Sequence, residues 1–172
     1  MSGTVILETE RLILRHWRVG DLTALQSIIC DQETMSHWPK PFDEVTSAAW
    51  LARAVSDESA PLPGRLGVYL KSDGSLIGDA GLARAEINGR QENDLGYIIH
   101  RNYWRHGYGL EVAHALLSYG HKTLGCDRVI ATMAEDNLPS IGLAKALGMT
   151  PEGCFPNPGN LGKTHLIFVS AH

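Results

Sequence analysis

The sequence is poor in cysteine, with only Cys30, Cys126 and Cys154 among its 172 residues. An odd, widely spaced set makes a poor disulfide framework and offers no paired ligands of the kind that zinc sites use. The 8 histidines add no metal site, because His114 and His121 lie on one helix without a third ligand at suitable spacing. We therefore predict no catalytic metal and a reducing, cytoplasmic setting.

Long apolar runs and an excess of basic residues are also missing. No segment approaches the length needed to cross a bilayer, and the first residues do not combine a basic stretch with a long apolar one, as a secretory signal would. The formal net charge is -4, whereas nucleic-acid-binding domains usually carry a basic excess. We expect neither a membrane nor a nucleic-acid partner, and one domain over residues 1–172.

The first half of the chain is predicted to hold two helices and an antiparallel meander. A short strand over Arg11–Arg15 precedes a helix that begins after Asp21, a plausible N-cap, and a second helix runs from near Asp43 to Val55. Strands follow from Leu66 to His100, with turns at 72–75 and 87–90, the first of which contains the strong turn signal Asp-Gly.

The second half changes to strands that alternate with helices. The predicted elements are a helix opening just after Gly107, a buried strand over Arg128–Met133, a helix over Ser140–Leu147, and final strands near Thr150–Phe155 and Thr164–Ser170. A strand–helix–strand run of this kind favours one parallel pair within an otherwise antiparallel sheet.

The most informative segment is the turn Trp104–Gly109, which follows an apolar strand and opens an amphipathic helix. Such a turn presents unpaired backbone N–H groups at the positive end of a helix, where phosphate or pyrophosphate binds. Gly107 and Gly109 would let the backbone approach the ligand, although the two glycines alone could also serve only to shape the turn. The sequence after Gly109 excludes a P-loop, and a turn placed after a meander disfavours a dinucleotide fingerprint.

The segment Tyr97–Glu111 resembles motif A of the GNAT acetyltransferases, Gln/Arg-x-x-Gly-x-Gly/Ala. Trp104 replaces the first Gln or Arg, and this departure is similar to the Rim-type branch, which acetylates the N-termini of ribosomal proteins. The opening Glu8–Arg15 resembles the same branch. Further along, 137–140, 147–149 and 152–153 are similar to motif B, Asn-x-x-Ser, Leu-Gly-Phe and Glu-Gly.

This resemblance implies a mixed α/β GNAT fold, with a mostly antiparallel central sheet, splayed between its fourth and fifth strands and flanked by about four helices. It implies acetyl-CoA as cosubstrate, with the pantetheine arm in the gap. The expected cofactor-binding residues are Tyr97, Ile98, Ile99, Arg105, His106, Gly107, Tyr108, Gly109, Leu110, Asn137 and Ser140.

The transfer of an acetyl group to an amine needs a neutral amine, donors for an oxyanion and a proton for the departing thiolate. Asp94 is the first candidate for a general base acting through water, with Glu92 and Glu135 in reserve, although Asp94 could instead be a solvated strand residue. Ser140 is the candidate proton donor, and helix N-capping is its alternative role. Asn137 either binds pantetheine or supports the turn.

The amine acceptor is expected between a wall at Met35–Pro39 and a lid at Phe155–Gly162, with Trp50 in the core. The predicted function is an N-acetyltransferase in which the amine attacks acetyl-CoA directly in a ternary complex. The acceptor is a protein N-terminal α-amine or a small-molecule amine, and a non-catalytic acyl-CoA-binding regulatory domain is the alternative. Both a monomer and a homodimer remain open.

Overall fold

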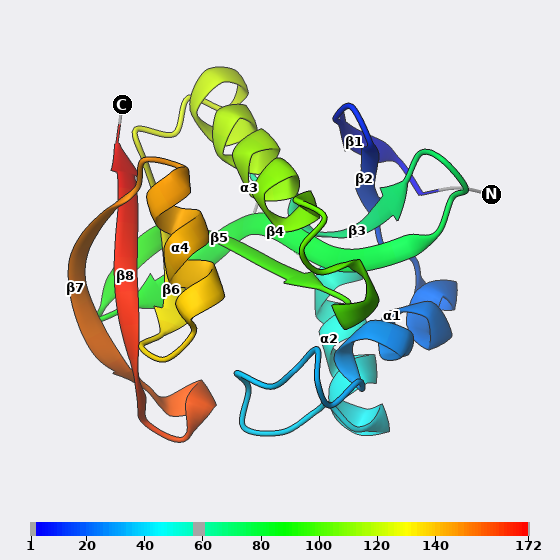
Figure 1. The fold of residues 1–172 in the computed structure, drawn as a ribbon, viewed down its shortest axis with the longest axis horizontal. Coiled ribbons are helices and arrows are strands. Elements are labelled where there is room, and N and C mark those ends of the chain that lie inside the picture. The colour runs from blue at the N-terminus through cyan, green and yellow to red at the C-terminus, as the bar shows by residue number, and fades with distance from the viewer. Residues whose placement is uncertain (1–2, 57–60, 172) are drawn as a thin grey trace.

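Eight strands form one sheet in the order β1-β2-β3-β4-β5-β6-β8-β7 in the computed structural model, which describes residues 3–56 and 61–171 (Figure 1). The strands are β1 (Val5–Glu8), β2 (Leu12–His16), β3 (Gly64–Leu70), β4 (Leu76–Ile87), β5 (Arg90–Ile99), β6 (Arg128–Ala134), β7 (Thr150–Asn157) and β8 (Lys163–Ala171). The α-helices are α1 (Leu22–Ile29), α2 (Glu44–Val55), α3 (Tyr108–Ser118) and α4 (Leu138–Ala146).

The sheet changes direction between β5 and β6, which are parallel, whereas every other neighbouring pair is antiparallel. The register between β5 and β6 reaches one residue pair, Asp94 opposite Ile130, and the two strands diverge beyond it. The predicted mixed sheet with a splay is therefore confirmed. The splay lies between the fourth and fifth predicted strands, which become β5 and β6 because the sequence analysis missed β1.

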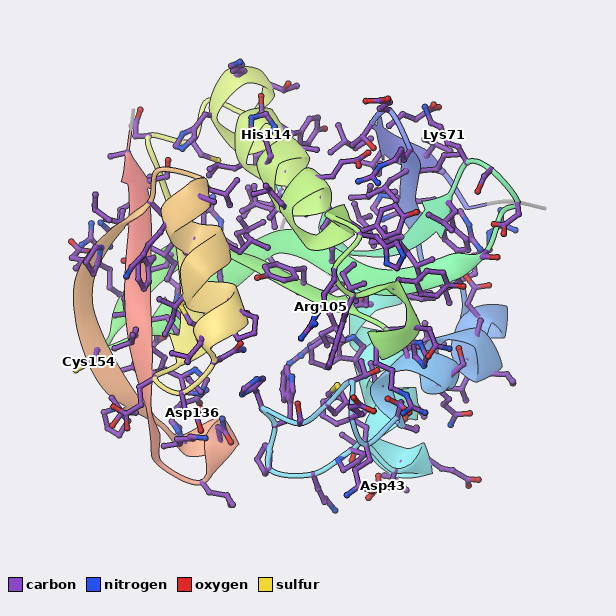
Figure 2. The ribbon with its side chains drawn as sticks, viewed as in Figure 1. Asp43, Lys71, Arg105, His114, Asp136 and Cys154 are labelled. Carbon is purple, nitrogen blue, oxygen red and sulfur yellow. The ribbon has the colours of Figure 1, made fainter. Side chains whose placement is uncertain are left out.

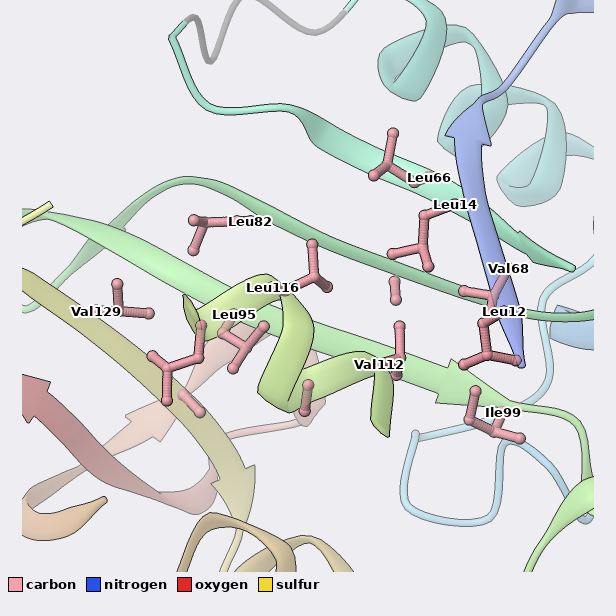
Figure 3. Close-up of a cluster of buried hydrophobic side chains, with 14 of the residues drawn as sticks. Leu12, Leu14, Leu66, Val68, Leu82, Leu95, Ile99, Val112, Leu116 and Val129 are labelled. Atoms are coloured by element: carbon pink, nitrogen blue, oxygen red, sulfur yellow. The ribbon is translucent and has the colours of Figure 1, made fainter. Parts of the chain in front are cut away.

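Alternation along β5 divides its side chains between two hydrophobic clusters. Leu95 and Ile99 pack with Val112 and Leu116 of α3 on one face of the sheet (Figure 3). Ile98 points to the other face, where it joins residues of α1 and α2. Each residue of β5 beyond Asp94 therefore faces one helical layer or the other, at the edge where the sheet opens.

The first two helices differ in how their N-termini are stabilised. Asp43 accepts a hydrogen bond from Thr46 N at 2.8 Å, so it caps α2, whose start was predicted near this residue. Asp21 precedes α1, but its carboxylate instead accepts from Arg18 N at 3.0 Å and Arg15 Nη1 at 3.1 Å. Asp21 therefore occupies the predicted N-cap position of α1, but its side chain turns back into the short 3₁₀ turn and makes no capping hydrogen bond to the helix.

Candidate active site

The edge of β5 that faces the splay carries backbone groups turned away from β4. His100 N donates to Ile77 O across β4, so the carbonyl and the N–H of Ile99 point the opposite way, into the splay. Trp104 Nε1 donates to Ile99 O from that side at 2.7 Å. Strand alternation places the N–H of Tyr97 on the same edge, whereas the backbone of Ile98 faces β4. Two main-chain donors, at 97 and 99, are thus available within the splay.

The glycine turn connects this strand to α3 through two residues with left-handed backbone. Arg105 has a φ of 62° and Gly107 a φ of 80°, and Tyr108 is the first residue of α3. The first hydrogen bond of the helix runs from Glu111 N to Gly107 O at 3.0 Å. The N–H groups before Glu111 therefore have no acceptor within the helix and project from its positive end. This is the geometry predicted for a phosphate-binding turn.

Arg11, which directly precedes β2, supports this turn, a role that was not predicted from the sequence. Its guanidinium pairs with Glu111 through Nε at 2.7 Å, donates from Nη1 to His106 O at 2.9 Å, and lies 4.4 Å from the centre of the Tyr108 ring. One side chain thus fixes the turn and the first turn of α3 together. A contact over 100 residues of sequence has no local signal.

On the opposite side of the splay, α4 brings Ser140 towards Tyr97. Asn137 is the N-cap of α4, and its side chain accepts from Ser140 N at 3.2 Å. The alternative role considered for Ser140, N-capping, is therefore wrong, and Asn137 has the supporting role. The Ser140 hydroxyl accepts from Tyr97 Oη at 3.2 Å. Burial raises the pKa of Tyr97, although the hydrogen bond to Ser140 opposes this, so the phenol remains a proton donor at neutral pH.

A cavity of about 670 Å³ occupies the splay. Tyr97, Ile98 and Ile99 line it from β5, so it passes from one face of the sheet to the other. Ten of the eleven expected cofactor-binding residues line the cavity, namely Tyr97, Ile98, Ile99, Arg105, Gly107, Tyr108, Gly109, Leu110, Asn137 and Ser140. The exception is His106, whose ring stacks on Tyr108 at 5.9 Å and whose Nδ1 lies 2.7 Å from Trp104 O.

Asp94 lies at the closed end of the splay and on the face of β5 that also carries Ile98. It does not line the cavity. Its Oδ1 is buried and has no hydrogen-bond partner among the described residues. Burial raises its pKa to about 6; the Arg65 guanidinium opposes the rise and Glu92 adds to it. A carboxylate of this kind titrates where a general base is useful.

The two reserve carboxylates are less suited to that role. Glu92 is buried, and Arg128 holds it through Nε at 2.9 Å and Nη2 at 3.0 Å. Glu135 is exposed just after β6. The geometry favours Asp94.

A second cavity of about 340 Å³ adjoins the first, and Ser36, His37 and Trp38 line both. Its other wall is the turn 160–163 between β7 and β8. Asn160 Nδ2 donates to His37 O at 3.1 Å, which joins the two walls. The wall and lid expected for the acceptor therefore meet beside the splay, as the neighbouring ribbons of the α1–α2 connection and the β7–β8 turn indicate (Figure 1).

A mixed sheet opened beside a helix N-terminus is the fold that the resemblance implies, and comparison with known proteins identifies the family. The family described as "Acetyltransferase (GNAT) domain" matches residues 11–150. The uncharacterized N-acetyltransferase YnaD of Bacillus subtilis (strain 168) is 30% identical over 150 residues, which cover 87% of this chain and 85% of YnaD. The chain therefore belongs to the GNAT acetyltransferase family.

Solved structures share the whole fold. Ribosomal-protein-S5-alanine acetyltransferase from Vibrio fischeri aligns with a TM-score of 0.76 and 18% identity, over 98% of this chain and 97% of that one. RimL, a ribosomal L7/L12 α-N-protein acetyltransferase in complex with coenzyme A, aligns with a TM-score of 0.78 and 15% identity, over 98% of each chain. Rim-type enzymes are thus among the structural neighbours, as the resemblance of the glycine turn predicts.

The part of the chain that the structure describes, residues 3–56 and 61–171, contains no group of three or more His, Cys, Asp or Glu side chains arranged to hold a metal ion. None of its helices is long and apolar enough to cross a membrane.

Proposed function

We propose that this enzyme transfers the acetyl group of acetyl-CoA to the α-amine of a peptide or protein N-terminus, by direct attack within a ternary complex. The observation that carries the proposal is the cavity that passes through the splay between the bare N-terminus of α3 and the α1–α2 connection. With the diphosphate of acetyl-CoA bound at one end of the cavity and the amine entering at the other, the thioester and the amine would meet along β5.

The cofactor would be held mainly by main-chain groups. The N–H groups of the turn before Glu111 would bind the diphosphate, and Arg105, which lines the cavity, would add positive charge (Figure 2). The pantetheine arm would run along β5 past Tyr97 and Ile99. Bound acetyl-CoA supplies an activated thioester carbonyl, and the N–H of Tyr97 or Ile99 would stabilise negative charge on its oxygen.

Proton transfers would be divided between two sites on opposite sides of the splay. Asp94, with its pKa raised by burial to about 6, would accept the amine proton through water. Ser140 would protonate the departing thiolate and take a proton from Tyr97, from which it already accepts a hydrogen bond, and Tyr97 would recover its proton from solvent. Separate base and acid allow direct transfer without an acyl-enzyme.

The basicity of the acceptor favours an α-amine over a lysine side chain. Free α-amines titrate near ~8 and lysine near ~10.4, so a base with a pKa of about 6 removes a proton from an α-amine with less difficulty. The names of the Rim-type structural neighbours point to the same class of acceptor.

The test is a panel of N-terminal peptides and small amines, assayed for acetyl-CoA-dependent thiol release, with acetyl-CoA binding measured separately by calorimetry. Acetylation of peptide α-amines, with binding retained and turnover lost in Asp94→Asn, is the expected result. Glu135→Gln is the matched control and should keep turnover. Activity confined to small amines would replace the acceptor in the proposal, and acetyl-CoA binding without turnover would indicate a regulatory domain.

A further inference from the structure

Two large apolar side chains stand exposed on opposite walls of the smaller cavity. Trp38, in the connection between α1 and α2, is 37% exposed, and Leu161, in the turn between β7 and β8, is 86% exposed. A single exposed leucine on a protein surface is ordinary. Here the leucine faces a tryptophan across a cavity that adjoins the proposed site of transfer.

Leu161 is held in a backbone conformation that leucine rarely adopts. Its φ is 54° and its ψ 29°, in the left-handed region where glycine and asparagine fit with least strain. The backbone on both sides is tied, because Gly162 N donates to Asn157 O at 2.8 Å and buried Asn160 bonds to His37 O. A residue without packing contacts that would justify its strain is a candidate for a functional role.

The side chain of Trp38 is also held in place, by packing against other aromatic rings. Its ring makes edge contacts with Phe42 at 5.4 Å and with Trp50 at 6.0 Å, and Phe42 and Trp50 also contact one another. The exposed part of the indole is therefore presented from a cluster of three rings. Little side-chain freedom would be lost when a ligand packs against it.

The charges around the smaller cavity are balanced, which argues for an apolar ligand group. Lys163 Nζ lies 2.5 Å from Asp136 Oδ2, and His37 Nδ1 lies 3.8 Å from Asp136 Oδ1. Figure 2 shows Asp136 beside the β7–β8 turn. Because Lys163, the lysine that lines this cavity, is already paired with Asp136, it leaves little charge to attract an anionic group.

We infer that Trp38 and Leu161 form an apolar subsite that selects the acceptor, by binding a large alkyl or aromatic side chain on a residue next to the acetylated one. The subsite rests on the proposed function, since the acceptor peptide must leave the splay past the shared residues Ser36, His37 and Trp38. The enzyme then recognises peptide N-termini with a large apolar residue at the second or third position.

The test compares peptides that start with serine and carry leucine or glycine at positions two and three. Transfer of a leucine side chain from water to an apolar subsite should raise kcat/KM roughly tenfold. Leu161→Asn should remove most of this preference while leaving acetyl-CoA binding unchanged, and its melting temperature should be at least that of the parent, since asparagine tolerates the left-handed backbone. Trp38→Ala should remove the preference as well.

Leu138→Ala is the matched control, because Leu138 is a leucine with 71% exposure that lines neither cavity; its preference should equal that of the parent. The subsite is refuted if the parent acetylates leucine and glycine peptides equally well, or if Leu161→Asn lowers activity on both by the same factor. A parent that acetylates no peptide at all would refute the proposed function together with the subsite.

Discussion

Asp94 should make the folded chain less stable at neutral pH than at acid pH. The pKa of this carboxyl is about 6 in the folded chain, against 3.8 for the ordinary group, and burial is the main cause. A carboxyl with a raised pKa favours folding while it is protonated. That contribution is complete below pH 3.8 and is lost as the pH rises through about 6.

The size of this effect follows from the shift of the pKa. The rise in the pKa of Asp94 from 3.8 to about 6 corresponds to about 3 kcal/mol of unfolding free energy lost between acid and neutral pH. Asp94→Asn keeps the shape of the side chain and removes its charge. The variant should therefore be more stable than the parent at pH 7 to 8 by up to about 3 kcal/mol, or roughly 6–12 °C in Tm for a chain of this length.

Activity should change in the opposite direction. A general base contributes on the order of 10²- to 10⁴-fold to the rate, so Asp94→Asn should lose a factor in this range in kcat/KM. In the parent, kcat/KM should rise through an apparent pKa of about 6 as Asp94 loses its proton, and this limb should be missing in the variant.

Two measurements check this reasoning, namely thermal unfolding of both proteins between pH 4 and 8 and pH profiles of thiol release. Glu135→Gln, which removes an exposed carboxylate, controls for a general effect of charge. A variant that melts below the parent at pH 8 would contradict the assigned burial cost. A variant that is stabilised but fully active would support the burial cost of the Asp94 carboxyl and refute its role as the general base.

Four further single variants test other parts of the site. Ser140→Ala and Tyr97→Phe should each lower kcat about 100-fold with little change in acetyl-CoA affinity. The double variant should be no slower than the slower single variant, because the two hydroxyls act in one relay. Additive losses in single-turnover kinetics would rule out the relay. Asn137→Ala should destabilise the fold by about 1 kcal/mol, because α4 loses its N-cap, and the midpoint of urea unfolding should fall. An unchanged midpoint would show that the cap does not stabilise the fold. Gly107→Ala should lower Tm by roughly 2–4 °C, since alanine is strained at a φ of 80°, and weaken acetyl-CoA binding in calorimetry; unchanged affinity would separate the turn from the cofactor.

Local signals in the sequence were sufficient for most of the fold and for the cofactor turn. The apolar periodicity of α3, the Asp-Gly turn after β3 and the glycines at 107 and 109 each depend on residues close together in the chain, whose backbone preferences act before any packing. The start of α2 near Asp43 was predicted for the same reason. β1 was missed because four residues of strand carry too little periodicity to be distinguished from a loop.

The tertiary structure decided which contacts the candidate residues make and how deeply they are buried. Ser140 accepts from a tyrosine 43 residues away, Arg11 supports a helix 100 residues further along, and the burial that raises the pKa of Asp94 comes from strands that neighbour it only in the folded sheet. The strained backbone of Leu161 likewise depends on bonds that tie the turn to Asn157 and to His37. Composition and spacing determine which groups are present, but electrostatics and hydrogen bonding depend on distances through space, which only the packed chain defines.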